Sequence, residues 1–332
     1  MKNFLFLFFI YANVMSLYSQ VGGEHVFEFL NLNTSPRTIA LGGYQGSVID
    51  DDLNSGIYNP AVINNLMVNK LNLNYNNYYA DIFYGDIGYC FNYLNQNIIS
   101  SIKFIDYGTF IETNELGVSI GEFQAGEYAF SLGSGFNVLD SVIHIGVNAK
   151  LAYSSLYQVS SSAIMLDVGL AYNSPKRDLT VSLMFRNIGY QIKPYYPGNK
   201  EKLPFEIVLG ISNRLEHMPL RWHLALQHIE TPNLFFEHTN SDIPQSNNFG
   251  YAVLKHIVFG SELLVHKNAS IIFGYNNRTR FEMIMQDRRG LVGFSCGMSF
   301  KIKRFHFYYS RSSHHYSGAL NSFGIVTNFQ KQ

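Results

Sequence analysis

Apolar and polar side chains alternate along most of this chain from about residue 69 onward. Between residues 292 and 302 small or polar residues hold the odd positions, and the even positions hold Val292, Phe294, Cys296, Met298, Phe300 and Ile302. Successive side chains of a β-strand point to opposite faces of the sheet, so this pattern predicts a strand with one apolar and one polar face. No convincing helical period of 3.6 residues interrupts the alternation.

Fourteen segments show this pattern, and the short joins between consecutive segments make them antiparallel neighbours. The predicted strands span about residues 69–79, 83–93, 97–113, 122–138, 142–158, 161–174, 179–195, 205–215, 220–229, 250–265, 269–283, 292–302, 304–313 and 321–329. The joins are mostly short at one end of the strands and long at the other, which is typical of an outer-membrane barrel. An even strand number puts both termini at one end, which we assign to the periplasm.

A soluble β-sandwich is the alternative fold, because its strands alternate in the same way. The polar face of the predicted strands carries charges at mid-strand, namely Lys150, Asp167, Arg186, Glu206 and Arg221. A packed core does not accept such charges, whereas a barrel lumen does, and lipid requires the continuous apolar outer face. We therefore predict an all-β, 14-stranded antiparallel transmembrane β-barrel. Its lumen charges form ion pairs or line a permeation path.

Composition and the N-terminus agree with an exported membrane protein. Charged residues make up 14% of the 332 residues, and 24 Lys and Arg balance 24 Asp and Glu. A nucleic-acid-binding face would need an excess of basic residues, so this class of partner is excluded. Residues 1–19 combine an early lysine with an apolar run of about ten residues, which predicts a cleaved signal peptide. We expect the mature chain in the outer membrane of a Gram-negative bacterium.

The two cysteines fall on opposite faces of their predicted strands. Cys296 shares the apolar face and is expected to contact lipid, whereas Cys90 is expected to point into the lumen. We therefore expect no disulfide between them, and two cysteines do not make a disulfide framework in any case.

Three short motifs imitate reactive sites. Gly293, Ser295 and Gly297 spell G-x-S-x-G, the nucleophile elbow of serine hydrolases, but no acid follows Ser295 and the strand pattern continues through it. Ser100 to Lys103 matches S-x-x-K without its partner motifs. Asp50 to Asn54 imitates the start of a calcium loop without its glycine and glutamate, so we expect a turn or lumen contact there, with a cation site as the alternative.

We therefore predict no enzymatic activity, no catalytic residue, no metal site and no cofactor. A bound lipid or lipopolysaccharide is the one ligand that these observations leave open.

Residues 20–66 do not alternate and precede the first predicted strand. Pro36 begins a short apolar stretch that ends at two glycines, which predicts a short helix with a glycine stop. A compact polar segment of this size can fill a barrel lumen, so we expect a hatch inside the barrel of residues 67–332. The candidate hatch residues are Arg37, Gly42, Gly43, Asp50, Asp51, Asn59 and Pro60.

This segment resembles the N-terminal hatch of FadL-like outer-membrane barrels. The motifs that carry the resemblance are Ala40-Leu41-Gly42-Gly43, Gly46-Ser47, Asp50–Asp52 and Asn59-Pro60-Ala61. Within that superfamily the mature chain is most similar to the PorQ family of the Bacteroidetes type IX secretion system, through residues 22–32, 35–43, 59–61, 186–193 and 203–207. The PorV family shares two of the hatch motifs and is the alternative.

Resemblance to the PorQ family implies a non-enzymatic outer-membrane subunit of the cell-surface attachment complex. That complex processes secreted cargo and couples it to lipopolysaccharide. The implied partners are a PorZ-like surface protein and the other subunits of the complex, with outer-membrane lipid around the barrel. A PorV-like cargo shuttle is one alternative function. A FadL-type transporter for hydrophobic ligands is another, and it would require an apolar pocket in the lumen.

The longest predicted outer loop spans Glu230–Phe249 and carries Leu234, Phe235 and Phe236. Apolar side chains on an outer loop indicate a docking surface for a partner. The alternative is an insert that folds over the mouth of the barrel.

Overall fold

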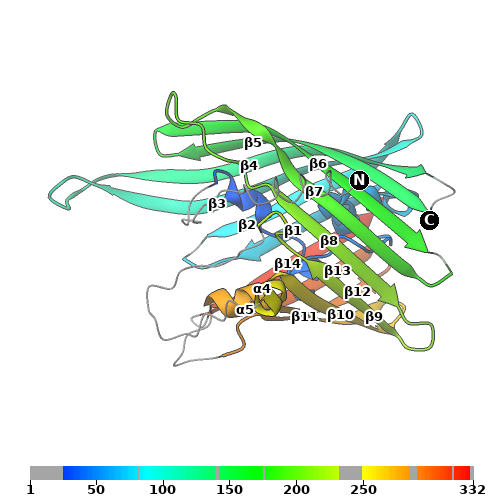
Figure 1. The fold of residues 1–332 in the computed structure, drawn as a ribbon. Helices are drawn as coiled ribbons and strands as arrows, with labels where there is room; N and C mark the ends of the chain where they lie inside the picture. The colour runs from blue at the N-terminus through cyan, green and yellow to red at the C-terminus, as the bar shows by residue number, and fades with distance from the viewer. Residues whose placement is uncertain are drawn as a thin grey trace, which may run out of the picture.

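The computed structural model describes residues 25–80, 82–138, 142–174, 176–231, 249–283, 290–315 and 318–329. Fourteen antiparallel strands form a closed barrel, in which sequence neighbours pair and β1 pairs with β14 (Figure 1). This confirms the predicted fold class. Within the described ranges, no helix is both long and apolar enough to cross a membrane.

The strand positions agree with the predicted ones to within a few residues at most boundaries. The strands are β1 (Lys70–Asn77), β2 (Phe83–Tyr93), β3 (Gln96–Thr113), β4 (Ser119–Val138), β5 (Ile143–Leu156), β6 (Val159–Ser174), β7 (Leu179–Lys193), β8 (Glu206–Arg214), β9 (Leu220–Leu226), β10 (Ile257–His266), β11 (Ala269–Asn276), β12 (Phe294–Ile302), β13 (Phe305–His315) and β14 (Gly318–Asn328).

Two segments that the alternation assigns to strands are helices instead, α4 (Phe249–His256) and α5 (Asn277–Met283). Segments of seven or eight residues are too short for periodicity alone to separate a strand from a helix. The start of α5 did carry a signal, because the Asn276 side chain accepts a hydrogen bond from the Thr279 backbone N–H at 3.2 Å. Asparagine is one of the preferred residues for this capping contact.

Burial alternates along the strands as expected for lipid outside and a filled lumen inside. In β12, Phe294, Cys296 and Met298 are exposed while the residues between them are buried. Cys90 is buried and both cysteines are free, as predicted. One assignment was wrong: Val292 was placed on the apolar outer face, but it precedes the strand and is only 1% exposed.

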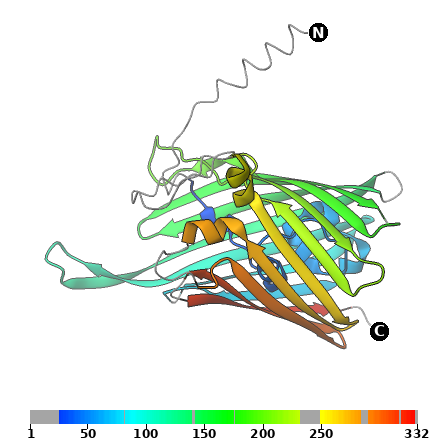
Figure 2. The same ribbon diagram turned by 60° about the horizontal axis from the view of Figure 1, so that its bottom comes forward.

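Residues 25–69 run through the lumen from one end of the barrel to the other (blue in Figures 1 and 2). His25 bridges to Lys202 in the loop after β7, and the segment ends where β1 begins. We call residues 25–69 the hatch. Its short elements are η1 (Glu28–Asn31), α2 (Pro36–Ala40), α3 (Leu53–Tyr58), η2 (Pro60–Val62) and η3 (Asn65–Met67).

The predicted short helix with a glycine stop is helix α2. Pro36 is its first residue, and the Ser35 hydroxyl accepts a hydrogen bond from the Thr38 backbone N–H. Gly42 follows the helix with φ of 92°, a conformation that side-chain-bearing residues rarely adopt. The helix therefore stops where the glycines allow the chain to turn.

Candidate functional site: the hatch and its contacts with the barrel wall

Arg37 joins the hatch to the barrel wall through a buried cluster of charges. Its guanidinium binds Glu262 of β10 with two hydrogen bonds, at 3.1 and 2.9 Å. It also lies 2.8 Å from Asp50 and 3.1 Å from Asp52 of the hatch. Arg221 of β9 completes the cluster at 3.1 Å from Glu262 and 3.4 Å from Asp50. Burial opposes the Arg37 charge, but the three carboxylates outweigh it and raise the Arg37 pKa above its ordinary value.

The acidic run that imitates a calcium loop forms the start of helix α3. The Asp50 side chain accepts a hydrogen bond from the Asp52 backbone N–H, and the Asp52 side chain accepts one from the Asn54 backbone N–H, both at 3.1 Å. The remaining oxygens of both carboxylates face Arg37. Within the described ranges, no group of three or more His, Cys, Asp or Glu residues is placed to hold a metal ion.

A second set of buried charges lies on the neighbouring strands β5 to β8. Lys150 of β5 pairs with Asp167 of β6 at 2.6 Å, and it also donates to the Asn187 side chain at 2.9 Å. Asn187 of β7 has φ of 58° and returns a backbone hydrogen bond to Asp167 at 2.8 Å. Its side-chain amide donates to Asn31 of the hatch at 3.0 Å and to the Pro204 carbonyl at 2.9 Å. Asn187 therefore connects the wall, the hatch and the loop after β7.

Arg186 precedes Asn187 and pairs with Glu206 of β8 at 2.8 Å, so two more of the predicted lumen charges form an ion pair. Its guanidinium also lies 4.7 Å from the centre of the Tyr58 ring in the hatch. The carboxylate and the aromatic face both compensate the charge of the buried arginine, although its Nε has no hydrogen-bond partner. The five predicted lumen charges therefore form two separate groups, and both groups contact the hatch.

A third group of buried polar residues joins strands β1 and β2 to the hatch, and it was not identified from the sequence. Asn72 and Asn74 of β1 each donate to Asp86 of β2, at 2.5 and 2.9 Å, and each also donates to Asn54 of the hatch, at 3.1 and 2.6 Å. All four residues are buried. The signal was the asparagine at every second position from Asn72 to Asn76, which places amides along the lumen face of β1.

The Asn59-Pro60-Ala61 motif lies on a row of wall glycines. Gly135, Gly146 and Gly169 are register neighbours on β4, β5 and β6. A Cβ atom at any of the three would come within 3.0 Å of the Asn59–Ala61 motif. Atoms do not pack this closely, so the glycines leave the space that the motif fills. Asn59 fixes its own turn by donating to the Gly46 carbonyl at 2.5 Å and accepting from the Ala61 N–H at 3.0 Å.

The Ala40-Leu41-Gly42-Gly43 motif lies on a second glycine row, which includes the serine-hydrolase-like motif. Gly260 of β10 and Gly274 of β11 are register neighbours beneath Leu41, and a Cβ atom at Gly297 would lie 2.7 Å from the Cβ atom of Ala40. The Ser295 hydroxyl donates a hydrogen bond to the Ala40 carbonyl at 2.9 Å. Ser295 is therefore a wall contact for the hatch.

Gly293 does not share the polar strand face on which the alternation placed it together with Ser295 and Gly297. It lies in the turn before β12 with φ of 86°, and a Cβ atom there would meet the Asn276 carbonyl at 2.8 Å and the Cβ atom of Arg280 at 3.0 Å. Its role is to let the chain turn tightly beside helix α5. The glycine spacing of the motif thus has two separate structural causes.

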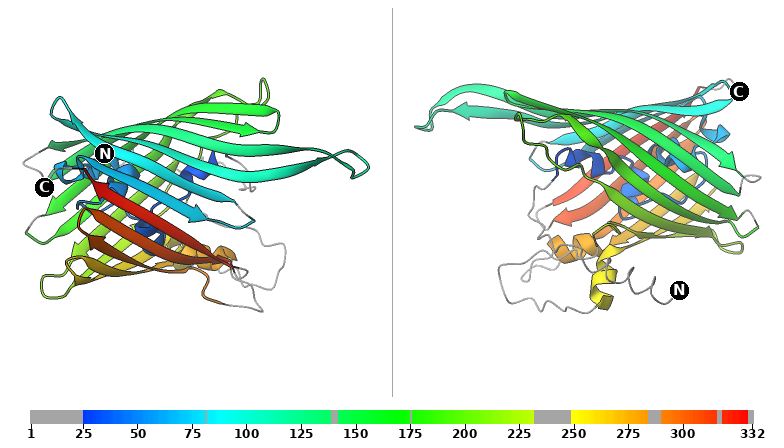
Figure 3. Two further views of the ribbon diagram at one scale, coloured as in Figure 1. Left: turned by 180° about the vertical axis from the view of Figure 1, so that it is seen from behind. Right: turned by 45° about the horizontal axis from the view of Figure 1, so that its top comes forward.

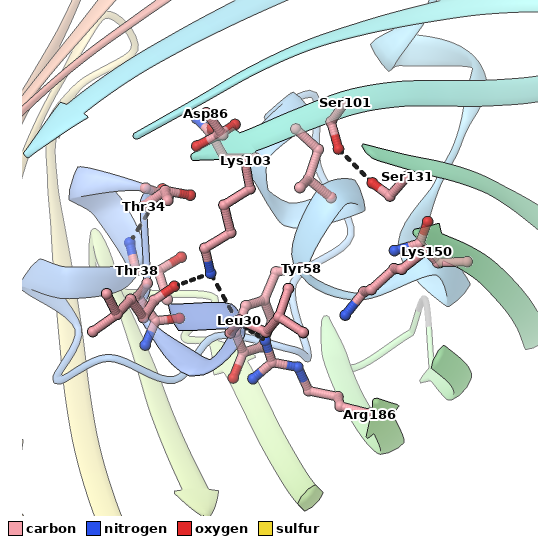
Figure 4. Close-up of a pocket in the computed structure, with 16 residues that line it drawn as sticks. Leu30, Thr34, Thr38, Tyr58, Asp86, Ser101, Lys103, Ser131, Lys150 and Arg186 are labelled. Atoms are coloured by element: carbon pink, nitrogen blue, oxygen red, sulfur yellow. Dashed lines mark hydrogen bonds between the residues drawn. The ribbon is translucent and has the colours of Figure 1, made fainter. Parts of the chain in front are cut away.

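A small cavity remains between the hatch and strands β2 to β7. Its volume is about 70 Å³, and its lining includes Lys103, Lys150 and Arg186 (Figure 4). Lys103 donates to the Leu30 carbonyl at 2.8 Å and also to the Leu32 carbonyl, at the end of the η1 turn. A cation is favourable beside such carbonyls, because they carry partial negative charge. Three cations therefore border the cavity, together with the apolar side chains of Leu30, Leu32 and Ile57.

The hatch is also fixed at the end of the barrel where β1 begins. The Asp51 carboxylate pairs with Lys70 of β1 at 2.7 Å and with Lys301 of β12 at 3.4 Å. Partial burial opposes the Asp51 charge, but the two lysines outweigh it and lower the Asp51 pKa to about 2. These three residues border a cavity of about 600 Å³ that Lys303 and Arg304 also line.

Two predictions fall outside the residues that the structure describes. They are the signal peptide at residues 1–19 and the apolar residues Leu234, Phe235 and Phe236 of the long outer loop.

No family model and no curated protein matches this sequence. Solved structures do match the fold. The toluene transporter TbuX of Ralstonia pickettii aligns with a TM-score of 0.55 and 14% identity over 91% of this chain and 100% of that one. A mutant of the monoaromatic hydrocarbon channel TodX aligns at 0.53 and 10% identity over 90% of this chain and 100% of that one. A Pseudomonas aeruginosa FadL homologue aligns at 0.47 and 11% identity, over 90% and 98%.

The fold is thus that of a FadL-like 14-stranded β-barrel, and the likeness extends over about nine tenths of the chain.

Proposed function

We propose that this chain is a non-enzymatic anchor in the outer membrane, which holds a surface partner at its outer end. This is the role that resemblance to the PorQ family implies, with a PorZ-like protein of the type IX attachment complex as the partner. The observation that carries the proposal is the fixed hatch. Arg37 lies 2.9 Å from Glu262, and Asn59 packs against Gly169. Asp51 lies 2.7 Å from Lys70, so the hatch is attached to the wall along its length.

The filled space between the hatch and strands β2 to β7 supports an anchor, because the fixed hatch leaves little room for a solute there. The larger cavity, of about 600 Å³, lies at the end of the barrel where β1 begins. The cavity beside Lys103 and Arg186 holds about 70 Å³. An apolar cavity that accepts benzene is about 150 Å³. Its lining combines Lys103, Lys150 and Arg186 with apolar side chains such as Leu30, Leu32 and Ile57, so the volume is what excludes a larger ligand. A monoaromatic ligand therefore does not fit the size of this space.

A FadL-type channel for hydrophobic compounds is the second candidate, and the fold comparison favours it. Both TbuX and TodX are described as conducting aromatic hydrocarbons, and both align along the whole barrel. One feature of the hatch fits this function: Phe27, Phe29 and Leu30 fill the outer half of the lumen as an apolar cluster. If these residues withdrew, the space that they leave would be lined in part by Ile105 and Met165. A channel would thus require the first hatch residues to move.

Purification of the tagged chain from its native outer membrane separates these functions. An anchor should co-purify with one resident surface protein in an amount equal to that of the tagged chain. A PorV-like shuttle should co-purify with varied secreted cargo, each in a smaller amount than the chain. Toluene uptake by cells that have or lack the chain tests the channel. Equal uptake together with a resident partner supports the anchor. Chain-dependent uptake by a barrel that purifies alone would replace the proposal with the channel.

A further inference from the structure

Strands β3 and β4 continue well beyond their neighbours. Pairing of β2 with β3 ends at Phe83–Asp106, and pairing of β4 with β5 begins only at Ala125–Leu156. Residues 107–124 therefore form a two-stranded ribbon that no other described strand borders. This ribbon extends past the barrel toward the left in Figure 1 and toward the left in the right-hand view of Figure 3. We call residues 107–124 the outer hairpin.

The outer hairpin lies beyond the part of strands β3 and β4 that can span the membrane. A strand of 18 residues such as β3 is roughly 60 Å long, whereas a hydrocarbon core of about 30 Å needs only about ten tilted residues. The hairpin connects an odd-numbered strand to the next even-numbered one, so it lies at the end opposite the C-terminus. With the C-terminus in the periplasm, the hairpin stands on the outer surface.

Large apolar side chains cover this hairpin although no lipid surrounds it. The exposed fractions are 67% for Ile111, 87% for Leu116, 57% for Val118 and 60% for Ile120. Exposed apolar residues beside unpaired strand edges favour association with another chain, and soluble surfaces normally avoid this combination. The composition therefore indicates a surface that is covered in use.

The outer hairpin is braced on one side and open on the other. The ring of Phe110 stacks on Phe123 at 5.2 Å between centroids, and Phe123 meets Tyr157 edge-on at 4.8 Å. The Tyr157 hydroxyl also donates to Glu112. These contacts bring the β5–β6 turn, which holds Tyr157, from the β4 side onto the face of the hairpin that carries Phe110 and Glu112 of β3. Pairing with β2 ends at Asp106, so no described strand borders the backbone edge of β3 from Thr109 to Thr113.

Charge decides between the candidate occupants of this edge. The chain has no Lys or Arg between Lys103 and Lys150, and the hairpin carries Glu112, Glu115 and Glu122. An anionic hairpin repels the phosphates of lipopolysaccharide and repels the same hairpin of a second copy. A basic and partly apolar protein surface is the complementary partner.

We propose that the open β3 edge of the outer hairpin docks a basic, partly apolar edge strand of a surface protein, which adds to the hairpin as a third strand. Backbone hydrogen bonds to residues 109–113 supply affinity, as in other cases of strand addition. Ile111, Leu116 and the glutamates supply specificity. This inference rests on the proposed anchor function, because it assigns that partner a binding site.

The first test trims the hairpin without disturbing the barrel. Thr109 and Gln124 are register partners, so residues 110–123 can be replaced by Asn-Gly, which favours a two-residue hairpin turn. Heat-modifiable gel mobility then checks that the trimmed barrel is folded. We expect the co-purified surface protein to fall at least tenfold, and also to fall in the double variant Glu115→Lys, Glu122→Lys. Unchanged recovery with the trimmed barrel would overturn the docking site while leaving the anchor function intact.

The second test identifies what lies on the edge. A photo-reactive phenylalanine analogue replaces Ile111 in the native outer membrane, and the control replaces Tyr93, which is 61% exposed at the other end of β2. We expect a cross-link from position 111, and not from position 93, to a strand that is rich in Lys or Arg. A cross-link to lipopolysaccharide, to a second copy of this chain or to an acidic segment would contradict the proposal. If no protein co-purifies with either the full or the trimmed barrel, the anchor function itself fails.

Discussion

Gly146 of strand β5 lies directly against the backbone of Pro60 in the hatch, and a side chain at this position would meet Pro60 and Ala61 within 3.0 Å. The contact is part of a fit between two motifs that are distant in the sequence. One glycine row holds the Asn59-Pro60-Ala61 turn, and another holds the Ala40-Leu41-Gly42-Gly43 turn. The hatch is therefore fixed by shape as well as by its buried charges.

Substitution of Gly146 by alanine should displace the hatch. Backbone atoms cannot move aside as a flexible side chain can, so overpacking here should cost about 1 to 3 kcal/mol or more. Trypsin cleavage after Arg37 measures the displacement, because Arg37 is only 5% exposed in the native barrel. We expect fast cleavage in Gly146→Ala and protection in the native chain. Gly250→Ala is the control, since a Cβ atom at Gly250 meets nothing within 4 Å. Equal protection of all three proteins would refute the close fit.

Replacement of Glu262 by glutamine should weaken the attachment of Arg37. Loss of one partner from a buried ion pair typically destabilises by about 3 to 5 kcal/mol. Arg37 keeps Asp50 and Asp52, so we expect a loss of about 2 to 3 kcal/mol. The temperature at which the barrel loses its folded gel mobility measures it. Glu282→Gln is the matched control, because it breaks only the partly exposed helical pair with Arg278 and should cost about 0.5 kcal/mol. Similar shifts in the two variants would show that the buried cluster contributes little.

Two substitutions of Asn187 separate the effect of its backbone strain on stability from the effect of its hydrogen bonds. Glycine at this position removes the contacts to Lys150, Asn31 and Pro204 but accepts the φ of 58°. Alanine removes the same contacts and adds strain of about 1 kcal/mol. We therefore expect Asn187→Ala to be less stable than Asn187→Gly, and both to be less stable than the native chain in denaturant titrations. Equal stability of the two variants would mean that strain at Asn187 is negligible.

The two cysteines report directly on the two faces of the wall. Cys296 is exposed on the outer face, where lipid surrounds it, and Cys90 is fully buried in the lumen. A lipid-soluble maleimide should label Cys296 in membranes, and a charged, water-soluble maleimide should label neither residue. Labelling of Cys90 by the charged reagent in the folded barrel would show that water and solutes pass through the lumen.

Alternation predicted most of the wall because one rule acts on every strand. Lipid requires apolar residues on one face, so Phe294, Cys296 and Met298 identified their strand without any tertiary information. The rule fails where the chain leaves the bilayer. Tyr251 and Val253 alternate as a strand would, but they lie in helix α4 at the barrel end, where lipid no longer imposes a period of two.

The wall positions that contact the hatch could be found only in part from the sequence. The alternation placed Ser295 and Gly297 on the polar face of β12, toward the lumen. That Ala40 lies against them, and that Pro60 lies on Gly146, depends on how two distant segments dock, which no local pattern encodes. The charges of Lys150 and Asp167 were visible in sequence as well, whereas their pairing follows from strand register.

The mass of the intact complex, extracted from native outer membrane and measured by native mass spectrometry, tests the central claim most directly. The anchor account predicts one copy of this chain bound to one copy of a surface protein, with the hatch closed and no hydrocarbon in the barrel. A mass equal to the barrel alone, or to the barrel with a bound aromatic molecule, would contradict the account and assign the chain to the hydrophobic-compound channels that its fold resembles.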